Sequence, residues 1–332
     1  MSISSKITTT RGLSVIIGLA AIAIAPFLVK PYQLDILIFL MINVLLVSSY
    51  RFNTLTGEWS LIHVVMMGVG AYTSALLTKE LGFSFWVSFP VATLVTAALA
   101  MLLSVPLFRM KAFYFLIGSF AAGEAIRLCW ERFRVPFGGP KGLKNIPPPE
   151  LATLDFFDPL TYYSFTAVVV VVSLYALYRL EKSRIGFTLH AIHWKDVLAE
   201  SVGVNARLYR SIAFGIASFF AAISGVLLAH YIGTVTPDRF GLGAMLMVLV
   251  WAIVGGTSTF AGPIIGVLLL TVSDNLLRGL DEVRPLVYGI ILIITIRFLP
   301  YGIEGLLPRL QELLNSKPKE LIEPTPRKKR SN

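Results

Sequence analysis

The chain has 332 residues, of which 55% are hydrophobic and only 14% are charged. Ordinary soluble domains carry about 25% charged residues, so this composition excludes a soluble globular domain and indicates a membrane protein. It also excludes an intrinsically disordered chain, and the single cysteine, Cys129, excludes a disulfide scaffold. Lysine and arginine outnumber acidic residues by 29 to 19, and their placement between apolar segments indicates membrane topology, not binding to nucleic acid.

Ten apolar segments approach the roughly 20 residues that a helix needs to cross the hydrocarbon of a bilayer. They cover residues 12–29, 34–50, 60–78, 83–108, 112–130, 160–178, 211–232, 241–254, 262–277 and 286–299. The last three are short or poorly separated. The sequence therefore predicts an all-α integral membrane protein with eight to ten transmembrane helices, in a membrane domain that covers residues 12–305.

The first segment resembles a signal peptide, because Lys6 and Arg11 precede it and Ala23-Ile24-Ala25 is similar to a cleavage box. Pro26 follows directly and argues against cleavage. We therefore expect an uncleaved helix, preceded by a cytoplasmic N-terminus at residues 1–11.

Positive residues near the ends of spans are retained on the cytoplasmic side. With ten spans that start inside, Arg51, the 109–111 turn, the long 179–210 segment and the basic tail at residues 306–332 all lie in the cytoplasm. Both termini are then cytoplasmic, and residues 131–159 form an external loop.

Glycines and charges inside the spans are candidates for a translocation path. Gly68 and Gly70 in the third segment, and Gly255 and Gly256 after the eighth, favour broken or re-entrant helices, which are tolerated only where they line a cavity or are buried in protein. Close helix packing explains Gly68 and Gly70 equally well.

Two polar residues join this set of candidates. Glu124 lies three residues before Arg127 on one helical face, so the two side chains pair with each other, snorkel to the interface, or mark a polar site on the path. His63 stands alone in an apolar segment, where a hydrogen-bonded packing role is the default and a place on the path is the alternative.

The external loop contains Gly138-Gly139-Pro140-Lys141-Gly142 and then three consecutive prolines at 147–149. This composition favours turns and extended backbone and continues neither neighbouring helix. The loop is either a plain connector or a docking surface, with Gly138, Gly139 and Gly142 as its candidate residues.

The 179–210 segment has a helical pattern, because Ile185, Leu189 and Ile192 recur at spacings of three and four residues. It predicts a cytoplasmic helical hairpin in which Glu200 lies near a helix end and Gly203 makes a turn. A short projecting amphipathic helix either is simply solvated or fits a groove on a partner.

Motifs for catalysis and for metal binding are absent from the sequence. There is no G-x-x-x-x-G-K-[ST] motif, so the chain has no P-loop for ATP. His190 and His193 could share a helix face, but no acidic or cysteine ligand recurs at a fixed spacing from them. We therefore expect neither a catalytic residue nor a metal site, and a protein that is not an enzyme.

Several motifs in order resemble those of branched-chain amino acid ABC transporter permeases of the LivM type. They are Ser60-Leu61-Ile62-His63 with Gly68-Val69-Gly70-Ala71-Tyr72-Thr73, Glu124-x-x-Arg127, Gly138-Gly139 with Lys141-Gly142-Leu143, Ala199-Glu200-Ser201-Val202-Gly203, and Gly255-Gly256-Thr257 with Gly262-Pro263. The resemblance covers about residues 40–305. Three positions depart from the family pattern, namely Ile62 and Ser258 in place of glycine and Phe187 in place of arginine.

The resemblance implies a permease subunit of an ATP-binding cassette importer for branched-chain amino acids, in a bacterial or archaeal plasma membrane. It implies a second permease subunit, two cytoplasmic ATPase subunits and an extracytoplasmic substrate-binding protein as partners, beside membrane lipids. Ala199, Glu200 and Gly203 would transmit the motion of the ATPases, and ATP and magnesium would bind only to those partners. The same scaffold serves amide and urea uptake, so urea or short amides remain an alternative cargo.

Two other classes of function stay open beside this one. An ATP-independent secondary transporter would also have broken spans and an intramembrane Glu124, but it would need no coupling segment. A membrane-embedded enzyme would need polar residues that converge at one depth, whereas Glu58, His63, Glu124 and His230 are scattered over the spans.

Overall fold

The computed structural model describes residues 25–26, 31–151, 155–276, 284–299 and 302–305. The expected first span, apart from residues 25 and 26, lies outside the described residues. So do the N-terminal residues 1–11 and the basic tail, and with them the expected cytoplasmic location of both termini.

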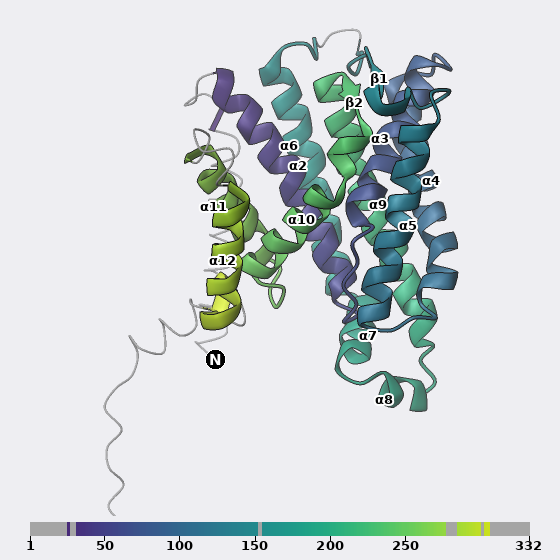
Figure 1. The fold of residues 1–332 in the computed structure, drawn as a ribbon, viewed down its shortest axis with the longest axis vertical. Coiled ribbons are helices and arrows are strands. Elements are labelled where there is room, and N and C mark those ends of the chain that lie inside the picture. Colours follow the sequence, from purple (N-terminus) through teal and green to yellow (C-terminus); the bar gives the residue numbers. More distant parts are fainter. Residues whose placement is uncertain (1–24, 27–30, 152–154, 277–283, 300–301, 306–332) are drawn as a thin grey trace, which may run out of the picture.

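The nine remaining apolar segments each coincide with a helix. These helices are α2 (Pro31–Thr54), α3 (His63–Lys79), α4 (Phe85–Leu107), α5 (Phe113–Arg132), α6 (Pro159–Glu181), α9 (Ala206–Ile232), α10 (Leu242–Gly255), α11 (Gly262–Leu276) and α12 (Arg284–Phe298). The predicted all-α class is confirmed (Figure 1).

Five helical segments of the described chain are long and apolar enough to cross a membrane by themselves. They lie at Tyr32–Thr54, Phe85–Leu107, Pro159–Glu181, Ala206–Ile232 and Pro237–Gly255. Helix α3 is shorter, at 17 residues, and α11 and α12 have 15 residues each. Helix α5 is polar near its end, where it carries Glu124, Arg127, Glu131 and Arg132. These four helices must therefore be stabilised by their neighbours.

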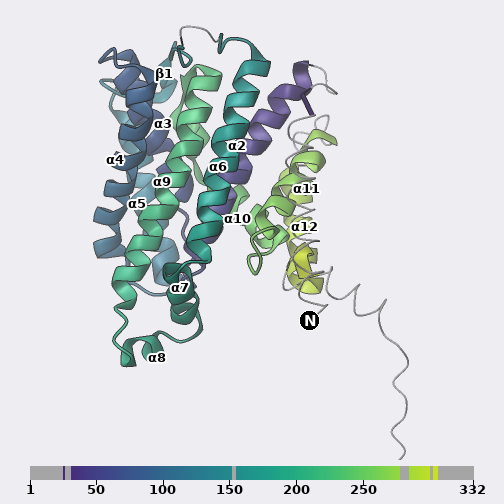
Figure 2. The same cartoon turned by 180° about the vertical axis from the view of Figure 1, so that it is seen from behind.

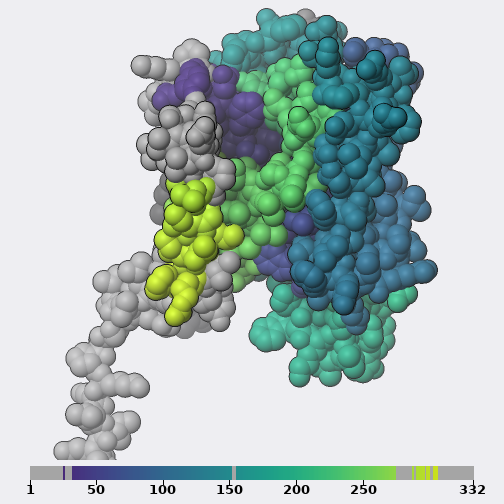
Figure 3. Space-filling model, in the orientation of Figure 1, coloured from purple at the N-terminus to yellow at the C-terminus, as the bar shows by residue number. Residues whose placement is uncertain are grey.

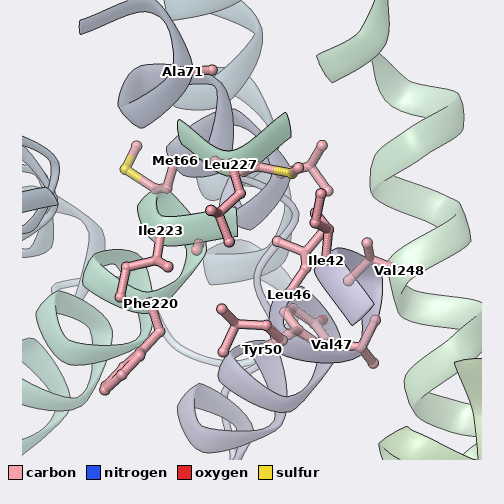
Figure 4. Packing of buried hydrophobic residues seen from close by; sticks show 14 of the residues in the cluster. Ile42, Leu46, Val47, Tyr50, Met66, Ala71, Phe220, Ile223, Leu227 and Val248 are labelled. Carbon is pink, nitrogen blue, oxygen red and sulfur yellow. The ribbon is translucent and has the colours of Figure 1, made fainter. Parts of the chain in front are cut away.

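Helix α9 is the centre of the bundle, and α2, α3 and α4 pack around it (Figures 1 and 2). It begins at Asn205, whose side chain accepts a hydrogen bond from the Leu208 N–H at 3.1 Å, and it ends at Gly233, which has a left-handed φ of 70°. The buried core between these helices is aliphatic and aromatic, with Leu46, Met66 and Leu227 among the side chains that meet there (Figure 4).

Small residues let α3 and α9 approach closely. A Cβ atom on Gly225 would lie 1.9 Å from the carbonyl oxygen of Met67, and one on Gly70 would lie 2.6 Å from Cα of Ala222. Such contacts are typical of helix pairs in membranes, where close backbone packing supplies much of the association energy. Helix α3 runs unbroken through Gly68 and Gly70, so close packing is the role of these two glycines in the fold, and no break occurs there.

The chain is interrupted between α10 and α11, as the glycines predicted. Helix α10 has only 14 residues and ends at Gly255, and a non-helical loop of residues 256–261 leads into α11. The two short helices pack against each other and against α2. This half of the fold therefore contains the broken pair of helices that the sequence indicated.

The two ends of the bundle differ in structure. One end, called the hairpin end here, carries the short helices α7 (Arg184–Trp194) and α8 (Asp196–Ser201), which project from it (Figures 1 and 2). The opposite end, called the sheet end, carries the strands β1 (Leu143–Lys144) and β2 (Thr234–Val235) and the 3-10 turns η1 (Gly139–Lys141) and η2 (Pro237–Phe240). A third 3-10 turn, η3 (Ile303–Gly305), follows α12.

Strands β1 and β2 pair antiparallel, with Leu143 opposite Val235 and Lys144 opposite Thr234. The sequence did not predict this sheet, because two residues a strand give no alternating pattern. The pairing needs a glycine at Gly142, where φ is 63° and a Cβ atom would lie 1.9 Å from the Val235 carbonyl oxygen.

Candidate functional site

The hairpin segment, residues 182–205, forms the predicted pair of short helices. Gly203 makes the turn after α8 with φ of 87°, and its N–H donates to the Glu200 carbonyl at 3.0 Å. The Val204 N–H donates to the Ala199 carbonyl at 3.1 Å. The turn that was expected at Gly203 is present, and a side chain there would have room but an unfavourable backbone conformation.

One face of the hairpin segment packs on the protein and the other is exposed. Ala199 is buried in a small cluster with Ile192 and Ala206, whereas Glu200 is exposed. Large apolar side chains also remain exposed on this segment, including Phe187, Trp194, Val197, Leu198 and Val202. Trp194 is 83% exposed and Val197 79% exposed. An apolar surface that projects beyond the bundle is typical of an interaction site.

Arg210, near the start of α9, ties the hairpin segment to the bundle. Its Nη2 atom lies 2.8 Å from both carboxylate oxygens of Asp196 in α8 and 3.6 Å from Oε1 of Glu58, in the loop between α2 and α3. Lys111 lies 3.7 Å from the same Asp196 carboxylate. We call Glu58, Lys111, Asp196 and Arg210 the Arg210 junction.

Two groups at the hairpin end have shifted pKa values. Burial raises the pKa of the Glu58 carboxyl, and the positive charge of Arg210 offsets part of that rise. Burial lowers the pKa of His190, and the negative charge of Glu181 offsets part of that fall. Both shifts favour the neutral form, as expected for groups that are removed from water.

A second junction centres on Arg51, in the last turn of α2. Its Nη1 and Nη2 atoms lie 2.6 and 2.9 Å from the two carboxylate oxygens of Glu181, the last residue of α6. Its Nε–H donates to the Thr257 carbonyl at 3.0 Å, and Nη2 reaches the Ser258 carbonyl at 3.4 Å. The pair is buried, with Arg51 only 1% exposed. Arg51 therefore joins the end of α2, the end of α6 directly before the hairpin segment, and the loop between α10 and α11.

The same loop is held from its other side by Glu304 in η3. The Glu304 carboxylate accepts the Ser258 N–H at 2.6 Å and the Thr259 N–H at 3.0 Å, and it also accepts from the Thr259 hydroxyl. We call Arg51, Glu181, Thr257, Ser258, Thr259 and Glu304 the Arg51 junction. Ser258, where the resembled family has a glycine, uses only backbone atoms in these contacts.

A cavity of about 340 Å³ lies between α2, α3, α9, η2 and α10. Small-molecule sites typically measure about 300–1,000 Å³, so it is large enough for a small metabolite. Much of its wall is formed by flexible or branched apolar side chains, namely Leu46, Val64, Met67, Leu228, Met247 and Val248. Figure 3 shows the face on which α10 lies, with the green of α10 set back between α5 and α12.

The remaining wall of the cavity is aromatic or polar. Phe39, Phe240 and Trp251 contribute rings, and Asn43 and Arg239 contribute polar groups. Sequence reasoning missed both polar residues. The available signal was a charged pair, Asp238-Arg239, placed directly before the apolar segment at 241–254.

The structure places none of the candidate path residues among those that line the cavity. His63 is buried and hydrogen-bonded to Ser49 at 2.9 Å, which matches the default packing role for an isolated histidine. Gly68 lies against Trp130 and Phe240, so it brings an aromatic wall residue close to α3.

The other candidate path residues also lie outside the cavity lining. Gly70 packs on Ala222 of α9, while Gly255 and Gly256 form the end of α10, one turn beyond Trp251 of the cavity wall. Glu124 does not reach the cavity. It forms an ion pair within α5, where Arg127 donates to its carboxylate at distances of 2.6–3.0 Å. Arg127 also lies 2.8 Å from Glu131, so the expected pairing of Glu124 with Arg127 is present, while a place for Glu124 on the path stays a prediction.

The external-loop candidates gather at the sheet end. Gly138, Gly139 and Gly142 all have left-handed φ values of 63–82° and form the tight turn η1 beside β1. The loop is thus a folded surface element, as its composition predicted. Its docking role stays a prediction.

The sequence profile of the family described as "Branched-chain amino acid transport system / permease component" matches residues 32–296. The high-affinity branched-chain amino acid transport system permease protein LivM of Escherichia coli K12 is 29% identical over 329 residues, which cover 91% of this chain and 76% of that protein. LivM of Salmonella typhimurium is 30% identical over the same shares.

A more distant relative is the autoinducer 2 import system permease protein LsrC of Salmonella paratyphi B. It is 24% identical over 68% of this chain and 71% of its own length. No solved structure matches the chain. The match over most of the chain, together with the apolar helices and the broken α10–α11 pair, shows that this protein belongs to the family of branched-chain amino acid transport permease components.

Proposed function

We propose that this chain is a permease subunit of an ATP-driven importer that moves branched-chain amino acids across a plasma membrane. The observation that carries the proposal is the similarity to two LivM permeases over 91% of the chain. A multi-pass membrane fold with a cavity of metabolite size agrees with this role.

The hairpin segment is the proposed contact with two cytoplasmic ATPase subunits. Its exposed apolar side chains, with Trp194, Val197 and Leu198 foremost, offer the kind of surface that fits a hydrophobic groove. Glu200 is exposed beside them, and the buried Ala199 anchors the helix. A push on α8 would reach α9 and the α2–α3 loop through the Arg210 junction, because Asp196 and Glu58 both pair with Arg210.

The Arg51 junction is the proposed second link between the ATPases and the path. Glu181 directly precedes the hairpin segment, and its partner Arg51 also holds the loop that follows α10. Helix α10 in turn supplies Met247, Val248 and Trp251 to the cavity wall. A displacement of the hairpin segment would therefore change the position of a helix that lines the cavity.

The orientation follows from the same assignment. The hairpin end lies in the cytoplasm, where Lys182, Arg184, Lys195 and Arg207 satisfy the preference for positive charge inside. The sheet end faces outward, and the folded loop at Gly138, Gly139 and Gly142 is a proposed seat for a substrate-binding protein. A second permease subunit completes the pore, and ATP and magnesium bind to the ATPases alone.

Uptake of labelled leucine into cells with and without this gene tests the proposal. We expect uptake that depends on the gene, that stops after ATP depletion, and that excess valine reduces while urea and glutamate do not. Uptake that survives ATP depletion would instead support a secondary transporter. If leucine uptake does not depend on the gene and urea uptake does, the cargo is urea or short amides instead of branched-chain amino acids.

A further inference from the structure

The cavity between α2, α3, α9, η2 and α10 combines an apolar wall with one cation. Its aliphatic lining comes from four different helices, with Leu46 from α2, Val64 and Met67 from α3, Leu228 from α9 and Val248 from α10. Among the described residues that line it, Arg239, in the 3-10 turn at the sheet end, is the one with a charge. An apolar pocket with a few convergent polar groups is the usual form of a small-molecule site.

Arg239 and Asn43 are available to a ligand. Within the part of the chain that the structure describes, neither side chain has a hydrogen-bond or ion-pair partner, whereas the buried Arg51 and Arg210 are both paired. The Arg239 side chain is exposed, so its charge does not need a protein partner to be tolerated. A guanidinium group binds carboxylates with two parallel hydrogen bonds. The cavity thus offers a receptor for a carboxylate beside an apolar space.

A carboxylate of the protein also lies next to the cavity. Asp35 precedes the wall residue Phe39 by one helical turn on α2, and it accepts a hydrogen bond from the Tyr231 hydroxyl. The Tyr231 ring in turn packs on Phe39, with ring centroids 5.6 Å apart. The cavity wall thus carries a cation on η2, and a carboxylate on α2 lies one helical turn from its wall residue Phe39.

We infer that this cavity is a substrate site for an aliphatic α-amino acid, with the α-carboxylate on Arg239 and the side chain against Val64, Met67 and Val248. The inference rests on the proposed function, and it adds the place and the chemistry of substrate recognition within this chain. The α-ammonium group points to Asn43, whose amide oxygen accepts a hydrogen bond, on the helix that also carries Asp35. An uncharged amide or urea would gain no ion pair with Arg239.

A larger residue in place of Gly243 tests whether the cavity must stay open for transport. It lies in the cavity wall on α10, and a Cβ atom there would meet no atom within 4 Å. Gly243→Leu therefore places its side chain in open space without straining the helix. Gly289 in α12 is a matched control, because a Cβ atom there also meets nothing within 4 Å and it does not line the cavity.

The test uses the whole importer, with both permease subunits, the ATPases and the binding protein reconstituted in lipid vesicles. Three quantities are measured, namely ATP-driven uptake of labelled leucine, ATP hydrolysis stimulated by the loaded binding protein, and photolabelling by photo-leucine, the diazirine analogue of leucine. We expect photolabel on α3 or α10, within residues 63–67 or 242–251. Excess leucine should remove it.

Gly243→Leu should lower leucine uptake about tenfold or more, as expected when a pocket rejects a few extra carbon atoms, and should remove the photolabel. Arg239→Gln should lower uptake by a similar factor, and Arg239→Lys should restore part of it. Gly243→Leu and Arg239→Gln should both retain the ATP hydrolysis that the loaded binding protein stimulates. Gly289→Leu and Arg297→Gln in α12 should leave all three quantities unchanged.

The outcomes separate the inference from the proposed function. Wild-type vesicles that take up no leucine would overturn both. Normal leucine uptake with photolabel outside the cavity, or with Gly243→Leu at wild-type rates, would overturn the substrate site alone. If Gly243→Leu no longer co-purifies with the second permease subunit, a side chain of that subunit fills the cavity and the substrate site is overturned. If Arg239→Gln loses uptake and stimulated ATP hydrolysis equally, Arg239 serves the docking of the binding protein and not the binding of substrate.

Discussion

Arg51 and Glu181 form a buried bidentate ion pair that joins the end of α2 to the end of α6, across 130 residues of sequence. Two further Arg51 N–H groups donate to the Thr257 and Ser258 carbonyls. One guanidinium group therefore holds together three segments that are far apart in the sequence. The pair lies between the hairpin segment and the helix that lines the cavity, so it has consequences for both stability and transport.

Removal of one partner of this pair should be strongly destabilising. Glu181→Gln leaves the Arg51 charge buried without its counter-charge, which costs about 3–5 kcal/mol for buried pairs. The double variant Arg51→Met with Glu181→Leu should recover much of this loss, because no charge remains to be desolvated. The melting temperature of the purified permease in detergent measures the effect.

Glu124→Gln is the control for that experiment. It breaks an ion pair within α5, but Arg127 keeps Glu131 as a partner at 2.8 Å. The free energy of unfolding should therefore fall by about 1 kcal/mol or less. Equal shifts of the melting temperature in Glu181→Gln and Glu124→Gln would contradict the prediction that the buried Arg51 pair matters more for stability than the pair within α5.

Close packing of α3 and α9 should make Gly225 intolerant of any side chain. The Cβ atom of Gly225→Ala would lie 1.9 Å from the Met67 carbonyl oxygen, so the helices must separate, at a cost of about 1–3 kcal/mol. Gly289→Ala, with open space at its Cβ position, should be neutral or slightly stabilising, because alanine is the better helix former. Thermal melting of the two variants compares them directly, and a neutral Gly225→Ala would show that the helices are less tightly packed.

The turn after α8 should be needed for coupling to the ATPases. Gly203→Val puts a β-branched residue at φ of 87°, which costs about 1–3 kcal/mol and should unfold the turn. We expect leucine uptake to fall roughly tenfold, while the protein stays in the membrane because the site is exposed and has no close neighbours. Gly203→Asn, which tolerates left-handed backbone, should be milder.

A stronger coupling variant combines Glu200→Arg with Gly203→Asp. It reverses the charge of an exposed residue of α8 and strains the turn, so it should abolish uptake at normal membrane levels. Quantitative blotting of membranes beside the uptake assay measures both. Full uptake in the double variant would rule out the assigned role of these residues.

Glu58 should give the hairpin end a measurable pH dependence. Burial raises its pKa above the ordinary value of 4.5, so the folded state favours the protonated form. The stability that this group contributes is complete below pH 4.5 and is lost as the pH rises through the higher pKa of the folded protein. Glu58→Gln cannot ionise and should keep that stability.

The difference in melting temperature between Glu58→Gln and the wild type should therefore increase in favour of the variant from about pH 4.5 upward and then level off. His190, whose pKa is lowered, acts in the opposite direction but is present in both proteins, so the difference isolates Glu58. A difference that stays constant with pH would contradict the raised pKa. A variant that becomes less stable as the pH rises would show that pairing with Arg210 outweighs burial.

Much of the fold could be predicted from local sequence. The segments at 34–50, 160–178 and 211–232 became α2, α6 and α9, because the length and hydropathy of a span are properties of consecutive residues. The break at Gly255-Gly256 and the turn at Gly203 were also visible, since glycines mark positions where the backbone leaves a helix. The helical hairpin followed from the spacing of Leu189 and Ile192.

Residue roles were harder to predict than elements. Gly68 and Gly70 fit a broken helix and a close contact equally well, and only the approach of α9 and of the Trp130 ring decided for the contact. Glu124 fit an ion pair and a path residue, and its rotamer within α5 decided for the ion pair. In both cases the local pattern was compatible with two structures, and contacts with other side chains selected one.

The sequence by itself determined that this protein is a helical membrane permease with a projecting segment between two of its spans, because apolar length, charge placement and ordered motifs are all carried by neighbouring residues. Only the tertiary structure decided that Arg51 meets Glu181, that Arg210 holds Asp196 and Glu58, and that Arg239 faces an aliphatic cavity. These contacts join residues from different helices. Their partners are set by how the helices pack against α9, and no local pattern in the sequence encodes that geometry.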